Sequence, residues 1–285
     1  GIRQEIPSMK AQYHLSVDML DAEIAMLKTK GIRAVLLFGE PADKDEAGSG
    51  AFAENGIVQR AVGEIKRTHP DLFVVTDVCL CQYKSDGHCC FFTDAGYIEH
   101  QKTLDALSQV AVSHASAGAD MVAPSDMMDG RVGSIRRALD AAGYASVSIM
   151  AYSAKYASHM YGPFRGAVHS APAFGDRKSY QMDFGNSKEA MREMKLDIEE
   201  GADIVMVKPA GPYLDIIRMG SQRFDIPMAA YQVSGEYSML YNAVQDGVLD
   251  RMAIYESLMA IKRSGADIII TYFAKQMAEL LGEVE

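Results

Sequence analysis

The chain has 285 residues, of which 48% are hydrophobic and 23% are charged, and its formal net charge is -10. This is ordinary globular composition, and a chain of this length can bury a large core. The acidic balance without a basic run argues against a nucleic-acid partner, and no apolar stretch approaches the roughly 18 residues that span a bilayer. Gly1–Lys10 lacks the apolar segment of a signal peptide, so we expect a cytoplasmic enzyme with no membrane partner.

Short apolar, β-branched runs recur along the chain, and each is followed by a longer amphipathic stretch. Several runs, such as Ile-Val-Met-Val, are apolar at every position, which is typical of strands buried on both faces of a parallel sheet. The sequence predicts seven strands: Arg33–Phe38, Leu72–Asp77, Ala119–Ala123, Val147–Tyr152, Asp203–Val207, Ile226–Tyr231 and Ala266–Thr271.

Helical periodicity occupies the stretches between these runs. The tripeptide Gly-Ala-Asp recurs at Gly118, Gly201 and Gly265, each time where a helix would end and a strand would begin. Three occurrences at equivalent junctions favour a repeated βα unit over coincidence. The predicted helices include Val17–Lys30, Asn186–Glu200 and Asp250–Ser264.

Seven strands suit either an open doubly wound sheet or a barrel that lacks one strand. No G-x-G-x-x-G motif follows the first strand, and no break in composition divides the chain into halves. We therefore predict a single TIM (β/α)8 barrel over residues 1–285. Because a barrel of this type has eight strands, the first strand would precede Gly1.

One connection, Ala157–Ser187, is unusually long and carries four Pro or Gly residues between Gly162 and Pro172. A structureless stretch of this length inside a compact domain is usually functional and is often an active-site lid. It follows the predicted strand Val147–Tyr152 on that strand's C-terminal side, which is the active-site face of a barrel. Residues 157–187 are therefore a predicted lid.

Two lysines stand where the catalytic residues of a barrel belong. Lys208 ends the run Ile-Val-Met-Val, and Lys155 lies just beyond the predicted strand Val147–Tyr152. Burial and a neighbouring ammonium both favour the neutral, nucleophilic amine. The alternative is a pair of surface lysines past two strand ends, but two equivalent placements favour the catalytic reading.

All four cysteines, namely Cys79, Cys81, Cys89 and Cys90, lie within twelve positions. A disulfide framework would be spread along the chain, so the cluster indicates reduced thiols or a metal site. Three thiolates would leave a tetrahedral zinc one open position, as in catalytic sites. Cys90 or His88 could instead complete a closed structural site, and unligated thiols remain a third possibility.

Taken together, these residues resemble the porphobilinogen synthase family, also called 5-aminolevulinate dehydratase. The resemblance covers nearly the whole chain, although Gln82 stands where many members have Pro and Cys90 where Gly is common. The motifs that carry it are Asp77-Val-Cys79-Leu-Cys81 with Gly87-His88-Cys89, Ala123-Pro-Ser125-Asp126-Met-Met-Asp129-Gly-Arg131, Tyr152-Ser-Ala-Lys155, Tyr161-Gly-Pro-Phe164-Arg165, Pro172-Ala-Phe174-Gly-Asp176-Arg177, Val207-Lys208-Pro209 and Val233-Ser234-Gly235-Glu236.

The resemblance implies a barrel that condenses two molecules of 5-aminolevulinate into porphobilinogen, in tetrapyrrole and haem biosynthesis. Lys208 and Lys155 are implied to form the two Schiff bases, and a catalytic zinc to bind Cys79, Cys81 and Cys89. The resemblance also implies substrate contacts from Arg165, Arg177, Gln181, Ser234, Tyr272, Phe164, Tyr161, Asp77 and Ser125.

Two further expectations come from the resemblance alone. Glu193, fifteen positions before Lys208, corresponds to a carboxylate that binds an allosteric magnesium in some family members. From its spacing alone, Glu193 reads as a solvated surface charge. The family also implies a homo-oligomer, either an octamer or a hexamer.

Two other functions are alternatives for this set of residues. Another Schiff-base barrel, such as an aldolase, would explain Lys208 but neither the thiol cluster nor Lys155. A zinc-stabilised binding protein would need a closed four-ligand site and would unfold on chelation.

Overall fold

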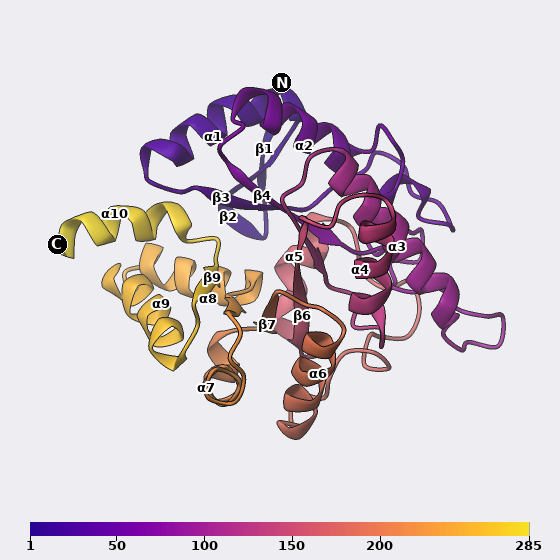
Figure 1. Ribbon diagram of the computed structural model, residues 1–285. Helices are drawn as coiled ribbons and strands as arrows, with labels where there is room; N and C mark the ends of the chain where they lie inside the picture. Colours follow the sequence, from indigo (N-terminus) through magenta and orange to yellow (C-terminus); the bar gives the residue numbers. More distant parts are fainter. Residues whose placement is uncertain (285) are drawn as a thin grey trace.

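The computed structural model describes residues 1–284 and contains a seven-stranded parallel sheet surrounded by helices (Figure 1). The strands pair in chain order, and every connection between neighbours carries at least one helix. All seven predicted strands are confirmed, with ends displaced by at most three residues. They are β3 (Ala34–Leu37), β4 (Phe73–Val78), β5 (Met121–Pro124), β6 (Ser148–Lys155), β7 (Ile204–Lys208), β8 (Met228–Tyr231) and β9 (Ile268–Ile270).

The helices pack against the outer face of this sheet, as expected for a barrel. The three predicted helices are confirmed as α1, α6 and α9, with shorter ends, and Val17–Met19 forms a 3-10 turn before α1. The full set is α1 (Leu20–Thr29), α2 (Ile57–Thr68), α3 (His100–Ser116), α4 (Arg131–Ala141), α5 (Gly162–Ala167), α6 (Lys188–Glu199), α7 (Leu214–Arg223), α8 (Ser234–Gln245), α9 (Met252–Ser264) and α10 (Ala274–Val284).

The Gly-Ala-Asp repeats mark the end of the barrel where the strands begin. Their glycines have φ angles of 106°, 104° and 118°, the left-handed region that glycine adopts without strain. Each aspartate then accepts a hydrogen bond from a backbone N–H of a neighbouring strand. The pairs are Asp120 with Val74 at 2.7 Å, Asp203 with Ile149 at 2.8 Å and Asp267 with Met228 at 2.9 Å.

The apolar core has separate parts inside and outside the strands. Inward-facing side chains fill the barrel, among them Val75, Met121, Met150 and Met206. The alternate positions of the same strands pack against the helices in larger clusters. Since both faces of each strand are covered, the runs are apolar throughout, as the sequence pattern predicted.

An N-terminal hairpin that the sequence did not predict lies beside the edge strands. It consists of β1 (Arg3–Ile6) and β2 (Met9–Leu15), paired antiparallel. Gln12 donates to the carbonyl of Tyr272, just after β9, while His14 lies 3.4 Å from the carboxylate of Glu40, just after β3. The hairpin therefore spans the side of the sheet where, among the described residues, β3 and β9 do not pair with each other.

Among residues 1–284, we find no helix with the length and apolar character needed to traverse a bilayer.

Candidate active site at the mouth of the barrel

A small cavity lies where the C-terminal ends of the strands meet, and its volume is about 30 Å³. Little space is therefore left free between the lining side chains. The cavity is lined by Phe38, Asp77, Cys81, Gln82, Ser125, Lys155, Tyr161, Phe164, Arg165, Arg177, Lys208, Tyr231, Val233, Ser234 and Tyr272. Most of the side chains singled out in the sequence are therefore brought together in one place.

Lys155 and Lys208 are the last residues of neighbouring parallel strands and stand opposite one another in the register. The sequence placed Lys155 beyond its strand, whereas β6 continues through it. An irregularity between Ala151 and Ala154 adds one residue to β6. Because side chains alternate between the two faces of a strand, this bulge turns Lys155 to the same face as Lys208.

The amine of Lys208 is buried among aromatic rings. Its Nζ lies 4.2 Å from the ring centre of Tyr231, 5.0 Å from that of Tyr152 and 5.3 Å from that of Tyr161. Burial, and then the positive charge of Lys155, lower the pKa of Lys208 to about 7. A substantial fraction of Lys208 is therefore a neutral amine near neutral pH, as a nucleophile requires.

Asp77 and Ser125 complete the polar floor of the cavity. Lys155 donates a hydrogen bond to the carbonyl of Ser125, and Asp77 accepts one at 3.2 Å from the amide of Gln82. The other carboxylate oxygen of Asp77 is buried without a partner. Burial raises the pKa of Asp77, whereas Lys155 and Lys208 oppose that rise.

The thiols of Cys79, Cys81 and Cys89 form a buried group in which all three sulfurs lie within 4.8 Å of one another. The Sγ atoms of Cys79 and Cys81 are 3.4 Å apart. Hydrogen bonds from these two thiols lower the pKa of Cys89 well below its usual range. Three converging soft ligands, one of them held as a thiolate, could bind a metal ion.

The two residues that could have closed this group do not join it in the described part of the chain. Both ring nitrogens of His88 are engaged elsewhere, Nδ1 with the hydroxyl of Tyr180 at 3.0 Å and Nε2 with the carbonyl of Phe174 at 2.9 Å. Cys90 is buried but lies outside the three-thiol group. Cys79, Cys81 and Cys89 are thus the thiols that could hold a metal, and Cys81 also lines the cavity.

Residues 157–187 cover the mouth and are more ordered than the sequence predicted. They are not structureless, because a 3-10 turn (His159–Tyr161) and α5 occupy their first part. The composition rich in Pro and Gly concealed this short helix, since Pro163 stands in its first turn, where proline is tolerated. The remainder, up to the start of α6, is irregular.

Hydrogen bonds from Lys44 and Arg177 hold this segment in place. Lys44 donates to the carbonyls of Val168 and His169, at 3.1 and 2.7 Å. Arg177 donates to the carbonyls of Gly87 and Ser170, at 2.8 and 2.6 Å. These contacts hold the segment against the rest of the barrel.

Two arginines of residues 157–187 line the cavity and have N–H donors without partners. Arg165 and Arg177 both line it, and the Nε atom of each is buried without a partner. Burial, and then the charge of Arg177, lower the pKa of Arg165. Gln181 lies just outside the lining, and its amide oxygen and nitrogen are also buried without partners. Such unpaired donors favour an anionic ligand between them.

Ser234 and Tyr272 also line the cavity. Ser234 begins α8, and its hydroxyl accepts from the backbone N–H of Phe164 at 3.0 Å. The hydroxyl groups of Tyr272 and Tyr231 are 3.0 Å apart. The start of a helix with hydroxyl groups nearby is a favourable place for a carboxylate.

Glu193 is remote from this cavity, on α6, and is half-buried. Burial, and then the negative charges of Asp129 and Asp197, raise its pKa to about 7. A bound cation would relieve this crowding of carboxylates. The structure therefore separates Glu193 from the residues at the mouth.

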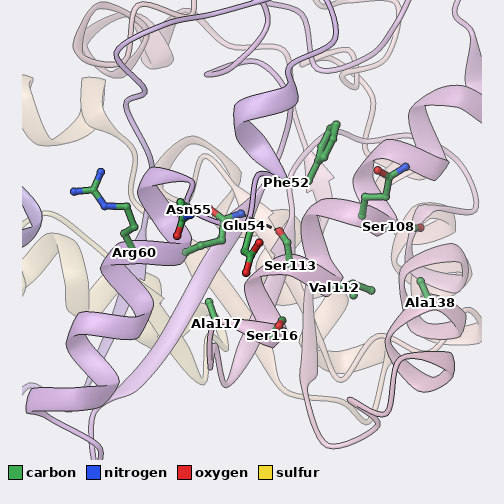
Figure 2. Close-up of a pocket in the computed structure, with 12 residues that line it drawn as sticks. Phe52, Glu54, Asn55, Arg60, Ser108, Val112, Ser113, Ser116, Ala117 and Ala138 are labelled. Atoms are coloured by element: carbon green, nitrogen blue, oxygen red, sulfur yellow. Dashed lines mark hydrogen bonds between the residues drawn. The ribbon is translucent and has the colours of Figure 1, made fainter.

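A larger cavity, about 750 Å³, lies elsewhere, on the outside of the barrel between α2 and α3 (Figure 2). Phe52, Glu54, Arg60 and Ser113 are among its lining residues. It contains neither of the paired lysines nor the thiols. Size therefore does not identify the active site here, whereas the perturbed groups at the mouth do.

The cavity also contains side chains that the sequence analysis did not assign to the site. Phe38, Tyr231 and Val233 lie at the ends of β3 and β8, and Gln82 was noted only as a departure from the family pattern. Their position at or soon after the end of a predicted strand was a usable signal. However, apolar side chains at strand ends are so common that the signal alone is weak.

The fold and the mouth together define a class of protein: a parallel α/β barrel with two buried lysines beside a cluster of thiols that could bind a metal. A family model described as Delta-aminolevulinic acid dehydratase matches residues 1–280. The protein of that name from Archaeoglobus fulgidus is 55% identical over 279 residues, which cover 98% of this chain and 86% of that protein. The one from Bacillus subtilis is 49% identical over 282 residues, covering 99% and 87%.

The chain therefore belongs to the delta-aminolevulinic acid dehydratase family. The solved structure of the Toxoplasma gondii delta-aminolevulinic acid dehydratase (porphobilinogen synthase), in complex with the reaction product porphobilinogen, superimposes with a TM-score of 0.98 at 42% identity. The match covers all of this chain and 82% of that one. The prediction of family and barrel fold from the sequence is confirmed.

Proposed function

We propose that this chain is a porphobilinogen synthase, which condenses two molecules of 5-aminolevulinate, with loss of two waters, into the pyrrole porphobilinogen. Family membership supports the reaction. The observation that carries the mechanism is the pair of buried lysines, Lys155 and Lys208, opposite one another at the mouth. A reaction that joins two keto substrates needs two adjacent sites for carbonyl activation, and two amines can supply them.

Lys208 attacks the ketone of one substrate, because its pKa of about 7 leaves it substantially neutral. Lys155 binds the second substrate in the same way from the neighbouring strand. Asp77, which lines the same cavity and has a free carboxylate oxygen, moves protons as each carbinolamine loses water. The rings of Tyr152, Tyr161 and Tyr231 exclude water around Lys208 and hold its amine in place.

Cys79, Cys81 and Cys89 hold a catalytic zinc in this proposal. The fit rests on three buried sulfurs within 4.8 Å and on the lowered pKa of Cys89. When bound, zinc would supply Lewis-acid activation of the second substrate. Cys81 brings the thiol group to the wall of the same cavity as Lys155.

The substrate carboxylates bind at opposite sides of the cavity. Arg165, Arg177 and Gln181 receive one of them, since each has an unpartnered buried polar atom. Ser234 and Tyr272 receive the other, close to the start of α8. Tyr161 and Phe164 line the wall between the two groups. Two separate carboxylate sites suit a reaction that uses the same substrate twice.

Residues 157–187 act as a lid, because Tyr161, Phe164, Arg165 and Arg177 of this segment line the cavity in which both lysines are buried. The lid must open for substrate to bind and then close to expel water. Lys44→Met removes two of its ties, so we expect faster hydrogen exchange across residues 162–177 and a higher KM. Unchanged exchange in that segment would contradict the proposed lid.

Glu193 binds a hydrated magnesium that favours the active assembly of a homo-oligomer. The support is its raised pKa beside Asp129 and Asp197, together with the preference of magnesium for one or two carboxylates plus water. Glu193→Ala should lose the magnesium dependence of activity and of assembly size. If the variant and the parent respond identically to a magnesium titration, Glu193 is only a surface charge.

The test of the function is turnover of 5-aminolevulinate to porphobilinogen by the purified chain, with and without a chelator. An aldolase would give no pyrrole, and a zinc-stabilised binding protein would unfold when the metal is removed. Pyrrole formation that chelation abolishes without unfolding supports the proposal. No pyrrole under metal-replete conditions would overturn it.

A further inference from the structure

Gln82 follows the thiol Cys81 in the chain, and its side chain is 2% exposed. It lines the cavity at the mouth together with both lysines. Its amide Nε2 donates to Oδ2 of Asp77, 3.2 Å away, and this bond is buried. Gln82 thus holds Oδ2 of Asp77, a carboxylate that lines the same cavity as Lys155 and Lys208.

The two oxygens of Asp77 consequently differ. Oδ2 is held by Gln82, whereas Oδ1 is buried without any partner among the described residues. A carboxylate held at one oxygen cannot rotate freely about its terminal bond, so the orientation of the other oxygen is set. A group that transfers protons within a closed site depends on such fixed geometry.

We propose that Gln82 is a positioning residue for this reaction: its amide holds Asp77 so that the free oxygen faces the lysines where the imines form. This inference rests on the proposed function. It assigns Gln82 no contact with the reacting atoms, because it acts through Asp77. It also gives a reason for a hydrogen-bond donor at this place in the chain.

The test is Gln82→Met, which keeps the length of the side chain and removes the donor. We expect kcat to fall about 10- to 100-fold with KM changed less than threefold, because binding contacts remain while the carboxylate loses its fixed orientation. The rate at which borohydride traps substrate on Lys208 in a single turnover should fall in parallel. Metal content, measured by elemental analysis, should equal that of the parent.

The matched control is Gln59→Met, since Gln59 is also a buried glutamine, 5% exposed, with an amide that donates to the carbonyl of Ala51 and the hydroxyl of Ser113. It lies outside the mouth, so it should lower the melting temperature and leave kcat and the trapping rate unchanged.

Three outcomes would overturn the inference. A Gln82→Met enzyme with kcat within twofold of the parent shows that the bond has no role. A loss of activity proportional to a loss of metal shows that Gln82 only supports the thiol segment. A parent enzyme that forms no pyrrole removes the proposed function itself, and this is distinguishable because the parent is assayed first.

Discussion

The two ends of the barrel differ in how their polar groups are paired. At the end where strands begin, Asp120, Asp203 and Asp267 each accept a hydrogen bond from the backbone of a neighbouring strand. At the mouth, polar atoms of Asp77, Tyr152, Arg165, Arg177 and Gln181 are buried without partners. Two lysines also share the mouth, although each disfavours the charge of the other.

An unpaired buried polar group costs free energy, whereas a paired one is neutral or favourable. The polar groups at the end where the strands begin, here called the lower end, therefore stabilise the fold. Those of the mouth are arranged for a ligand, which supplies the missing partners when it binds. The comparison predicts that substitutions at the mouth change activity and leave stability intact, while substitutions at the lower end do the reverse.

The largest effect is expected for Lys208→Met. It should reduce kcat by at least about 10⁴-fold, because no other amine stands at its position. The free energy of unfolding should stay equal or rise, since an apolar side chain replaces a buried amine. Borohydride with substrate should label Lys208 and Lys155 in the parent. Label on other lysines only, or a destabilised variant with normal activity, would break the comparison.

Metal removal is expected to have the next largest effect. Chelation, or Cys89→Ser, should reduce activity by about 100-fold or more while circular dichroism shows an intact barrel. The core is large enough to fold without the ion, unlike that of a zinc finger. Unfolding on chelation would instead show that the thiols stabilise the fold, as the aspartates of the lower end do.

The pH dependence of the mouth should follow Lys208. Its pKa of about 7 is below the ordinary lysine value, so the nucleophilic amine is lost as pH falls below about 7. We expect kcat/KM to fall about 10-fold per pH unit on the acid side and to level off above. In Lys155→Met, the midpoint for trapping substrate on Lys208 should move upward, because a neighbouring positive charge is removed. An unchanged midpoint would mean that burial alone sets the pKa.

The smallest effect on activity is expected at the lower end. Asp203→Ala removes the acceptor of the Ile149 N–H and should lower the free energy of unfolding by about 1 kcal/mol. Activity should remain within twofold of the parent. Asp203→Asn, which retains an acceptor, is the control and should lose less stability. A large loss of kcat without a loss of stability would show that the two ends are coupled.

How much of this could be read from the sequence differs between the two ends. The glycines and aspartates of the lower end recur in a fixed local pattern, so Gly118, Gly201 and Gly265 were placed correctly as helix ends. The seven strands were found because β3 to β9 are covered on both faces and are therefore apolar throughout. Local patterns of this kind are visible in a single sequence.

The mouth depends on contacts between distant segments, which local patterns do not show. The bond from Gln82 to Asp77 and the ties from Lys44 to the lid were not predicted for this reason. The hairpin β1–β2 was missed although Met9, Ala11, Tyr13 and Leu15 alternate with polar residues, which is the period of a strand. The helix α5 was concealed by its own Pro and Gly residues.

The extra residue in β6 makes the active site sensitive to a change in length as well as in composition. Since Lys155 and Lys208 are register partners, their backbones lie about 4.8 Å apart, the spacing of hydrogen-bonded strands. The register of the sheet thus keeps the two lysines side by side. If β6 kept its length but lost the bulge between Ala151 and Ala154, regular alternation would turn Lys155 to the outer face of the sheet. Every chemical group would still be present, but the two lysines would no longer share one face.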